Sequence, residues 1–179
     1  MEKIVNGKVY KILKFLGKGK GGYSYLAEYD SNLCCLKQIH HEPCSYYEFG
    51  NKIEAELNDY KKLINVGINI PKLIEVDIDN EIIIKEYING PNIYELVKND
   101  QMDDKYIEIV KKIAEKCFNH NLNIDYYPTN FIVKDNDLYY IDYECNFYED
   151  KWNFSNWGIK YWSKTEEFLK TLHGEIISE

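Results

Sequence analysis

The chain has 179 residues, of which 45% are apolar and 15% aromatic, and its formal net charge is −8. This composition supplies enough apolar side chains for a core, which excludes a disordered chain, and the length fits one domain or two small lobes. The negative charge disfavours non-specific binding to nucleic acid or to an anionic membrane surface. It still permits a nucleotide in a locally positive pocket.

The apolar runs are shorter than a membrane-spanning segment, and the N-terminal residues lack the apolar core of a signal peptide. The five cysteines show no paired metal-ligand spacing, which is typical of reduced thiols. We therefore expect a cytoplasmic protein. Cys34 and Cys35 are adjacent in a predicted strand, so their side chains would point to opposite faces. The other three cysteines are Cys44, Cys117 and Cys145.

The first part of the chain predicts β-structure. Asn6-Gly7 lies between apolar runs and indicates a hairpin. Residues 10–30 then predict a strand, a glycine-rich turn and a second strand, and residues 31–39 predict a third, so that the three form an antiparallel meander. Two further strands are expected at residues 72–78 and 81–88.

Helical patterns separate and follow these strands. A helix is expected from Ser45 to about Val66, because Ser45 and Glu48 match a capping box and Gly67 follows. Further helices are expected near residues 93–97, over 103–119 and at the end of the chain. The residues expected to face inward on the first and third helices are Phe49, Ile53, Leu57, Tyr60, Leu63, Ile64, Tyr106, Val110, Ile113, Ala114 and Cys117.

The glycine-rich turn contains Gly17, Gly19 and Gly22 in G-x-G-x-x-G register. A dinucleotide fingerprint opens a helix, whereas a strand-like segment follows here, which argues against a Rossmann-type enzyme. Three glycines at the tip of a hairpin let backbone N–H groups approach a phosphate chain. The alternative is a flexible hairpin tip.

A lysine and a glutamate form a second candidate feature. Lys37 shares one face of its strand with Cys35, and it would serve either as a phosphate ligand or as a surface lysine. Glu56 projects through the middle of the apolar stripe of the first helix. A carboxylate there is costly unless a cation meets it, and Lys37 is the candidate cation. The alternative is that Glu56 bends out to solvent.

Three polar residues surround a predicted hairpin in "IDYYPTNFIVKDNDLYYIDYE". Asp125 and Asn130 bracket a proline-containing turn, and Asp142 ends the second strand. If the strands pair across the Asp-Asn-Asp turn, Asn130 and Asp142 lie at the same open end of the hairpin. Carboxylate and amide oxygens are ligands suited to Mg²⁺, and Asp125 could accept a proton from a hydroxyl. Each residue alone is also typical of a turn.

Taken in this order, the motifs resemble those of the protein-kinase-like superfamily over about Tyr10 to Glu144. "LGKGKGGYSYLAEY" resembles the nucleotide-covering loop, "CCLK" stands where that family has V-A-I-K, and "KEYING" resembles the hinge segment. "DYYPTN" resembles the catalytic loop and "IDYE" the metal-binding D-F-G, while Glu56 matches the glutamate of helix C.

The resemblance implies binding of ATP and Mg²⁺ and a role for each matching residue. Lys37 would hold the α/β-phosphates, oriented by Glu56, and Asp125 would be the catalytic base. Asn130 and Asp142 would hold Mg²⁺. The glycines of the loop would cover the phosphates, and the backbone of Glu86 and Ile88 would meet the adenine.

The departures from the family pattern narrow the resemblance. Asn123-Ile124 replaces the usual His-Arg, Tyr127 replaces a lysine of many serine kinases, and the A-P-E segment is missing. The I-D-Y-E motif is similar to that of choline and aminoglycoside kinases, and the short tail is similar to that of minimal, Rio-like kinases. The tail's Trp152, Trp157 and Trp162 would either form an aromatic box for a quaternary ammonium or, the favoured reading, pack a core.

The expected fold is therefore α+β and two-lobed, in one kinase-like domain over residues 1–179. Residues 1–88 would form a five-stranded antiparallel N-lobe with one helix, and residues 89–179 a truncated, mainly helical C-lobe. The expected function is ATP- and Mg²⁺-dependent transfer of the γ-phosphate to a protein serine or threonine or to a small-molecule hydroxyl. The alternative is a nucleotide-binding pseudokinase or scaffold. Neither nucleic acid nor a membrane is an expected partner, and the sequence does not indicate the phosphoacceptor or the oligomeric state.

Overall fold

The computed structural model describes residues 1–43 and 50–174, and the chain divides into two units. The first unit comprises residues 1–58 and 71–87, and the second comprises residues 59–70 and 88–179. The boundary falls inside helix α1 (Lys52–Val66), so that its N-terminal part belongs to the first unit. The predicted α+β class is confirmed.

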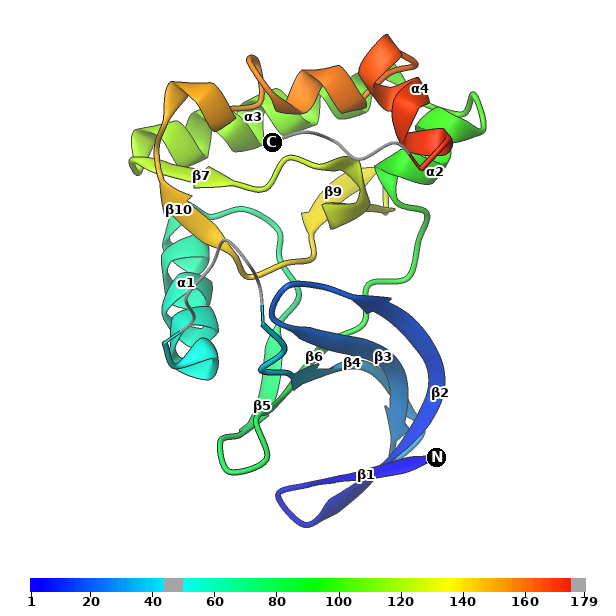
Figure 1. Ribbon diagram of the computed structural model, residues 1–179, viewed down its shortest axis with the longest axis vertical. Coiled ribbons are helices and arrows are strands. Elements are labelled where there is room, and N and C mark those ends of the chain that lie inside the picture. Colours follow the sequence, from blue (N-terminus) through cyan, green and yellow to red (C-terminus); the bar gives the residue numbers. More distant parts are fainter. Residues whose placement is uncertain (44–49, 175–179) are drawn as a thin grey trace. The chain divides into compact units, whose positions relative to one another are not determined.

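A curled antiparallel sheet makes up most of the first unit (Figure 1). Over the residues described, this sheet has six strands in the order β1-β2-β3-β4-β6-β5, one more than predicted, because the hairpin at Asn6-Gly7 adds a short edge strand. The strands are β1 (Glu2–Val5), β2 (Lys8–Lys18), β3 (Gly22–Tyr29), β4 (Asn32–Ile39), β5 (Leu73–Asp77) and β6 (Ile82–Glu86).

The two faces of this sheet differ in character. Cys34 and Leu36 of β4 point to one face and join its apolar cluster, whereas Cys35 and Lys37 point to the other. Alternation along the strand therefore separates the structural side of the sheet from the side that carries Lys37. The cluster contains Val5, Tyr10, Ala27, Cys34, Leu36, Ile82 and Ile84.

Two turns of the first unit are fastened to each other by Asp77. Its carboxylate accepts hydrogen bonds from the backbone N–H of Asn6 (2.9 Å) and from the backbone and side chain of Asn80 (3.0 and 2.9 Å). The side-chain amide of Asn6 also donates to Glu75 (2.9 Å). The first hairpin is thereby held to the turn between β5 and β6.

Substituting Asp77 with asparagine should lower the melting temperature by several degrees at neutral pH. The hydrogen bonds, first that of the Asn80 side chain, lower the pKa of Asp77 below its ordinary value of 3.8. Because the folded-state pKa is depressed, the contribution to stability is present above pH 3.8 and is lost as the pH falls through the lowered pKa. Circular dichroism melts at pH 7 and at pH 2.5 would measure the difference, with Asp79→Asn as the matched control. An equal drop at both pH values would contradict this account.

Helix α1 ends at Val66 as predicted but begins at Lys52, later than the predicted Ser45. The proposed capping box at Ser45 and Glu48 lies outside the described residues. Within the described part, the side chain of Asn51 accepts from the backbone N–H of Glu54 (3.1 Å). Ile64 is 52% exposed, so its predicted inward position is wrong. Ile53, eleven residues earlier, points within about 20° of the same direction and is 3% exposed, so the helical repeat alone does not explain the exposure of Ile64. The two residues belong to different units and so have different neighbours.

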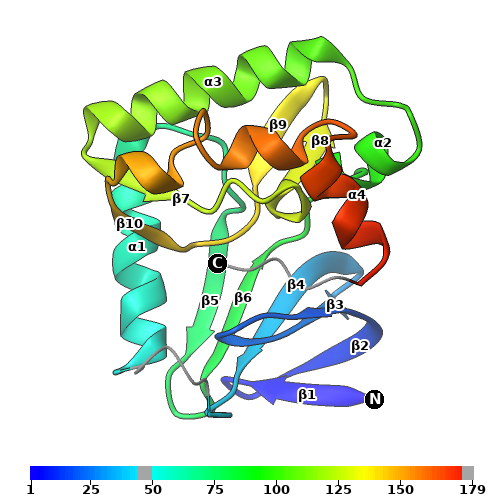
Figure 2. The ribbon, with the colours of Figure 1, turned by 45° about the horizontal axis from the view of Figure 1, so that its top comes forward.

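The described residues of the second unit form three further helices and two strand pairs. Helix α3 lies along β7 and the β8–β9 hairpin (Figure 2). The predicted helices and hairpin are confirmed, whereas the pairing of β7 with β10 was not predicted. The elements are α2 (Ile93–Lys98), α3 (Asp104–Asn119), β7 (Leu122–Ile124), β8 (Phe131–Lys134), β9 (Asp137–Tyr140), β10 (Cys145–Phe147) and α4 (Glu166–Leu172), with 3₁₀ turns at Pro128–Asn130, Asp150–Trp152 and Gly158–Tyr161.

The aromatic tail contributes to the core of the second unit. Trp162 is 1% exposed, and its indole N–H donates to the carbonyl oxygen of Tyr126 (2.8 Å). At Gly158 an added Cβ would lie 2.6 Å from the Cβ of Tyr126 and 2.9 Å from the ring of Phe154, so only glycine fits there. Trp162 therefore has the predicted core role, while Trp157 is only half-buried.

The described cysteines are buried free thiols. Burial raises the pKa of Cys34 and of Cys117 to about 11 and that of Cys145 to about 12, which keeps all three protonated at neutral pH. Cys44 lies outside the described residues. In the described part of the chain, every helix is too short or too polar to cross a membrane.

Candidate active site

The glycine-rich turn of the first unit connects β2 to β3. It is closed by a hydrogen bond from the N–H of Gly19 to the carbonyl oxygen of Gly22 (2.9 Å). An added Cβ at Gly22 would lie 2.6 Å from the carbonyl oxygen of Gln38, so this position requires glycine. At Gly17 an added Cβ would meet nothing within 4 Å, and the fold itself does not require glycine there.

Gly21 is the glycine that lies nearest to the charged residues. A Cβ at this position would be 3.4 Å from Glu56 Oε1 and 3.6 Å from Lys37 Nζ. A side chain would therefore occupy the space directly beside those two groups, and glycine leaves it open. Gly21 falls outside the G-x-G-x-x-G register and was therefore not predicted as a site residue, although the Gly21-Gly22 doublet is visible in the sequence.

Lys37 and Glu56 form an ion pair between β4 and α1. The two side chains are 12% and 14% exposed, so the pair is largely shielded from water. Glu56 Oε2 is also buried, and it has no hydrogen-bond partner among the residues that the structure describes. Oε1 of Glu56 thus binds the ammonium group of Lys37, while Oε2 remains able to accept a hydrogen bond.

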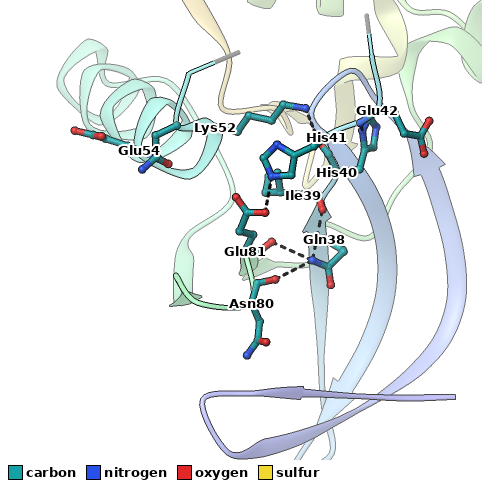
Figure 3. Close-up of polar contacts among 10 residues, drawn as sticks. Gln38, Ile39, His40, His41, Glu42, Lys52, Glu54, Asn80 and Glu81 are labelled. Atoms are coloured by element: carbon teal, nitrogen blue, oxygen red, sulfur yellow. Dashed lines mark hydrogen bonds and ion pairs between the residues drawn. The ribbon is translucent and has the colours of Figure 1, made fainter. Parts of the chain in front are cut away.

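Lys52 helps to set the position of Glu56. It lies one helical turn before Glu56 in α1, is 4% exposed, and donates a hydrogen bond to the carbonyl oxygen of His40 at the end of β4 (Figure 3). Gln38 in the same strand donates to the carbonyl oxygen of Asn80 (2.9 Å). The bond of Lys52 therefore ties the helix that carries Glu56 to the end of the strand that carries Lys37, and the bond of Gln38 ties that strand to the turn between β5 and β6. No sequence pattern indicated the role of Lys52.

The predicted hinge residues belong to different units. Glu86 ends β6 in the first unit, where its N–H donates to the carbonyl oxygen of Lys72 (2.8 Å) and its carboxylate accepts from the N–H of Lys72 (3.2 Å). Ile88 belongs to the second unit and is 2% exposed. The backbone of Glu86 is thus held in register with the neighbouring edge strand.

In the second unit, Asp125 and Asn130 are tied together around a 3₁₀ turn. One carboxylate oxygen of Asp125 accepts from the N–H of Tyr127 (3.0 Å), and the side-chain amide of Asn130 donates to the carbonyl oxygen of Asp125 (3.4 Å). Asp125 is exposed to solvent. Because the amide nitrogen of Asn130 faces Asp125, its amide oxygen is directed elsewhere and can serve as a ligand.

The β8–β9 hairpin brings Asn130 and Asp142 to its open end. Phe131 pairs with Tyr140, and the N–H of Ile141 donates to the carbonyl oxygen of Asn130 (2.9 Å). One carboxylate oxygen of Asp142 accepts from the N–H of Tyr143 (2.8 Å). The described residues contain no group of three or more His, Cys, Asp or Glu side chains that could hold a metal. The hairpin end offers one amide and one carboxylate.

Tyr140 connects this hairpin to Asp125. Its buried hydroxyl donates to the carbonyl oxygen of Glu144 (2.8 Å) and accepts from the N–H of Asp125 (3.3 Å). Burial, followed by the negative charges of Asp142, Asp125 and Glu144, raises the pKa of Tyr140 well above its usual value. The phenol therefore stays neutral and positions two of the predicted site segments. This role of Tyr140 was not predicted from the sequence.

For the phosphotransferase that the sequence predicts, substituting Tyr140 with phenylalanine should lower phosphoryl transfer about 10- to 100-fold and leave the affinity for ATP nearly unchanged. The change removes the hydroxyl that positions the backbone of Asp125 but keeps the buried ring. Separate measurements of kcat and of the Kd for ATP would show the effect, with Tyr139→Phe as the neighbouring control. Equal losses in kcat and in ATP affinity would identify Tyr140 as a purely structural residue.

Asn123 stands where the resembled family usually has histidine. It is 5% exposed, and its side-chain amide donates to the carbonyl oxygen of Glu149 (2.8 Å). Its amide oxygen is buried without a hydrogen-bond partner among the described residues. Asn123 therefore supports the segment after β10.

Comparison with known proteins agrees with the kinase-like character of these motifs. No family model matches the chain. It is 28% identical over 88 residues to the KEOPS complex subunit Bud32 of Pyrococcus abyssi, a match that covers 47% of this chain and 40% of that protein. It is 38% identical over 91 residues to a probable bifunctional tRNA threonylcarbamoyladenosine biosynthesis protein of Methanocaldococcus jannaschii, covering 48% of this chain and 16% of that protein. The chain is thus similar to atypical, Bud32-type members of the kinase-like superfamily.

Proposed function

We propose that this chain is an ATP- and Mg²⁺-dependent phosphotransferase that moves the γ-phosphate of ATP to a hydroxyl group. The observation that carries the proposal is the shielded Lys37–Glu56 ion pair with Gly21 beside it. The similarity to Bud32-type proteins supports the same chemistry. The matches span less than half of either relative, so the activity of the whole protein is part of the proposal.

The first unit fits a phosphate chain. Lys37 supplies a cation that Glu56 holds in one orientation, and the open space at Gly21 lets a phosphate group come close to that cation. Gly17, Gly19 and Gly22 belong to the same loop and would cover the phosphates. In this proposal the backbone of Glu86 and Ile88 binds the nucleobase.

The second unit fits a magnesium ion. Asn130 and Asp142 offer two oxygen ligands, and Mg²⁺ in phosphate-transfer sites commonly keeps its remaining positions for water and phosphate oxygens. When bound, the ion would neutralise charge on the phosphates during transfer. The hydrogen bonds of Asn130 and Asp142 to the neighbouring backbone restrict their rotamers and so prepare the two oxygens for binding.

Asp125 acts as the general base of the proposed reaction. Its carboxylate accepts the proton of the acceptor hydroxyl as the acceptor oxygen forms a bond to the γ-phosphorus. The bond between the γ-phosphorus and the bridging oxygen breaks, and ADP leaves with that electron pair. The exposure of Asp125 allows a hydroxyl to reach it, and its bond to the N–H of Tyr127 fixes the carboxylate.

The remaining parts of the proposal concern the setting of the reaction. The acceptor is a protein serine or threonine or a small-molecule hydroxyl, and the chain works in the cytoplasm as one kinase-like domain with an N-lobe at residues 1–88 and a C-lobe at residues 89–179. The Pyrococcus relative is named as a subunit of a complex. We include a protein partner in the proposal for this chain on that ground.

Incubation with γ-labelled ATP tests the proposal. In the presence of Mg²⁺ we expect ADP formation and transfer of the label to the chain itself or to an added acceptor. In EDTA we expect ADP to form only at the rate measured without the protein. Asp142→Asn should behave in Mg²⁺ as the wild type does in EDTA. If ATP binds but ADP never exceeds the blank, the nucleotide-binding pseudokinase replaces the phosphotransferase.

A further inference from the structure

The sheet face that carries Lys37 also carries a second shielded lysine. Lys85 of β6 pairs directly with Cys35 of β4, and Cys35 lies two residues before Lys37 on the same strand. Paired residues share a face, as do residues two apart, so all three side chains lie on one side of the sheet. Lys85 is 6% exposed.

The surroundings of Cys35 show that both ammonium groups are near it. Burial raises the pKa of the Cys35 thiol, and the charges of Lys85 and then of Lys37 act in the opposite direction. The strand that places Lys85 there is otherwise apolar and buried over residues 82–84. A buried ammonium group is costly where an aliphatic side chain would pack, which points to a functional reason for this lysine.

Lys85 directly precedes Glu86, whose backbone binds the nucleobase in the proposed function, and the present inference rests on that function. Lysine is a hydrogen-bond donor only, with three N–H groups, so it can keep a contact within the protein and still bind a ligand atom. Adenine carries an amino donor at its 6-position, whereas guanine and hypoxanthine carry a carbonyl acceptor there. A lysine beside the base therefore favours the 6-oxopurines.

We propose that Lys85 donates a hydrogen bond to the 6-carbonyl of a purine, and that the chain takes GTP and ITP as phosphate donors in addition to ATP. ITP shows whether the 6-carbonyl or the 2-amino group of GTP is recognised, because it has the 6-carbonyl and lacks the 2-amino group. The bond is charge-assisted, which corresponds to about a tenfold effect on affinity.

Affinities of Mg-ATP, Mg-GTP and Mg-ITP for the wild type, Lys85→Met and Lys72→Met test the inference. Methionine keeps the length of the side chain without the charge, and Lys72 is an exposed lysine adjoining Glu86 on the neighbouring edge. In the wild type, GTP and ITP should bind at least as tightly as ATP. Lys85→Met should weaken both about tenfold and leave ATP unchanged or tighter, and Lys72→Met should leave all three ratios unchanged.

Two results would overturn the inference. The first is that the affinities for GTP and for ITP, each divided by the affinity for ATP, are the same in the wild type and in folded Lys85→Met. The other, which applies even if Lys85→Met does not fold, is a wild type that binds ATP about tenfold or more tightly than both 6-oxopurines. ATP binding with either result removes only the role of Lys85. A wild type that binds none of the three nucleotides removes the proposed function as well.

Discussion

Asp125→Asn should reduce phosphoryl transfer by about 10²- to 10⁴-fold while the Kd for ATP stays nearly the same. Asparagine has the shape of aspartate, and its amide oxygen can still accept the N–H of Tyr127 that now binds Asp125 (3.0 Å). The amide cannot take a proton from an acceptor hydroxyl. The substitution therefore removes the base and preserves the turn.

Steady-state rates together with equilibrium binding of ATP would measure this effect. Asp135→Asn, in the turn between β8 and β9, is a matched control, because it changes the same chemical group at a turn position where asparagine is readily accommodated. Transfer in Asp125→Asn equal to that of the control would remove the assigned role of Asp125. A parallel loss of ATP affinity would indicate a damaged fold rather than a missing base.

Lys37→Met should have two effects that a second substitution can separate. It removes the proposed phosphate cation, so ATP affinity or transfer should fall by about 100-fold or more. It also leaves the shielded carboxylate of Glu56 without its cation, which should lower the free energy of unfolding by about 3 kcal/mol.

The double variant Lys37→Met/Glu56→Gln distinguishes these effects. Because it removes the unpaired charge, it should recover most of the lost stability, and because the cation is still missing, it should not recover transfer. Denaturant unfolding and activity assays on the two variants and on the exposed control Lys14→Met would show this. Unchanged ATP binding and transfer in Lys37→Met would make Lys37 a structural lysine.

The positions of Lys37 and Glu56 could be predicted because each follows from the regular repeat of side chains along a single strand or helix. Strand alternation assigned Lys37 to the face opposite the apolar cluster, and the helical repeat placed Glu56 on the buried side of α1. The same holds for Asn130 and Asp142, since the register of a short hairpin follows from its turn. In each case the relevant contact is fixed within one or two elements.

Features that depend on packing between distant segments were missed. The bond from Lys52 to the carbonyl oxygen of His40 and the two hydrogen bonds of Tyr140 join separate elements, and no repeat in the sequence marks them. Gly21 became significant only because α1 and β4 place charged groups beside it. Ile64 was placed wrongly because it points in nearly the same direction as the buried Ile53, and the helical repeat does not show whether another segment covers that side of the helix.

A thermal-shift titration with ATP, with and without Mg²⁺, on the wild type and on Asp142→Asn tests most directly whether the chain binds a metal–nucleotide complex. We expect ATP to raise the melting temperature of the wild type in Mg²⁺, and we expect this rise to be lost in EDTA and in Asp142→Asn. A rise that is the same with and without Mg²⁺ and in both proteins would contradict the metal site and favour a nucleotide-binding pseudokinase. The absence of any rise at millimolar ATP would contradict nucleotide binding itself.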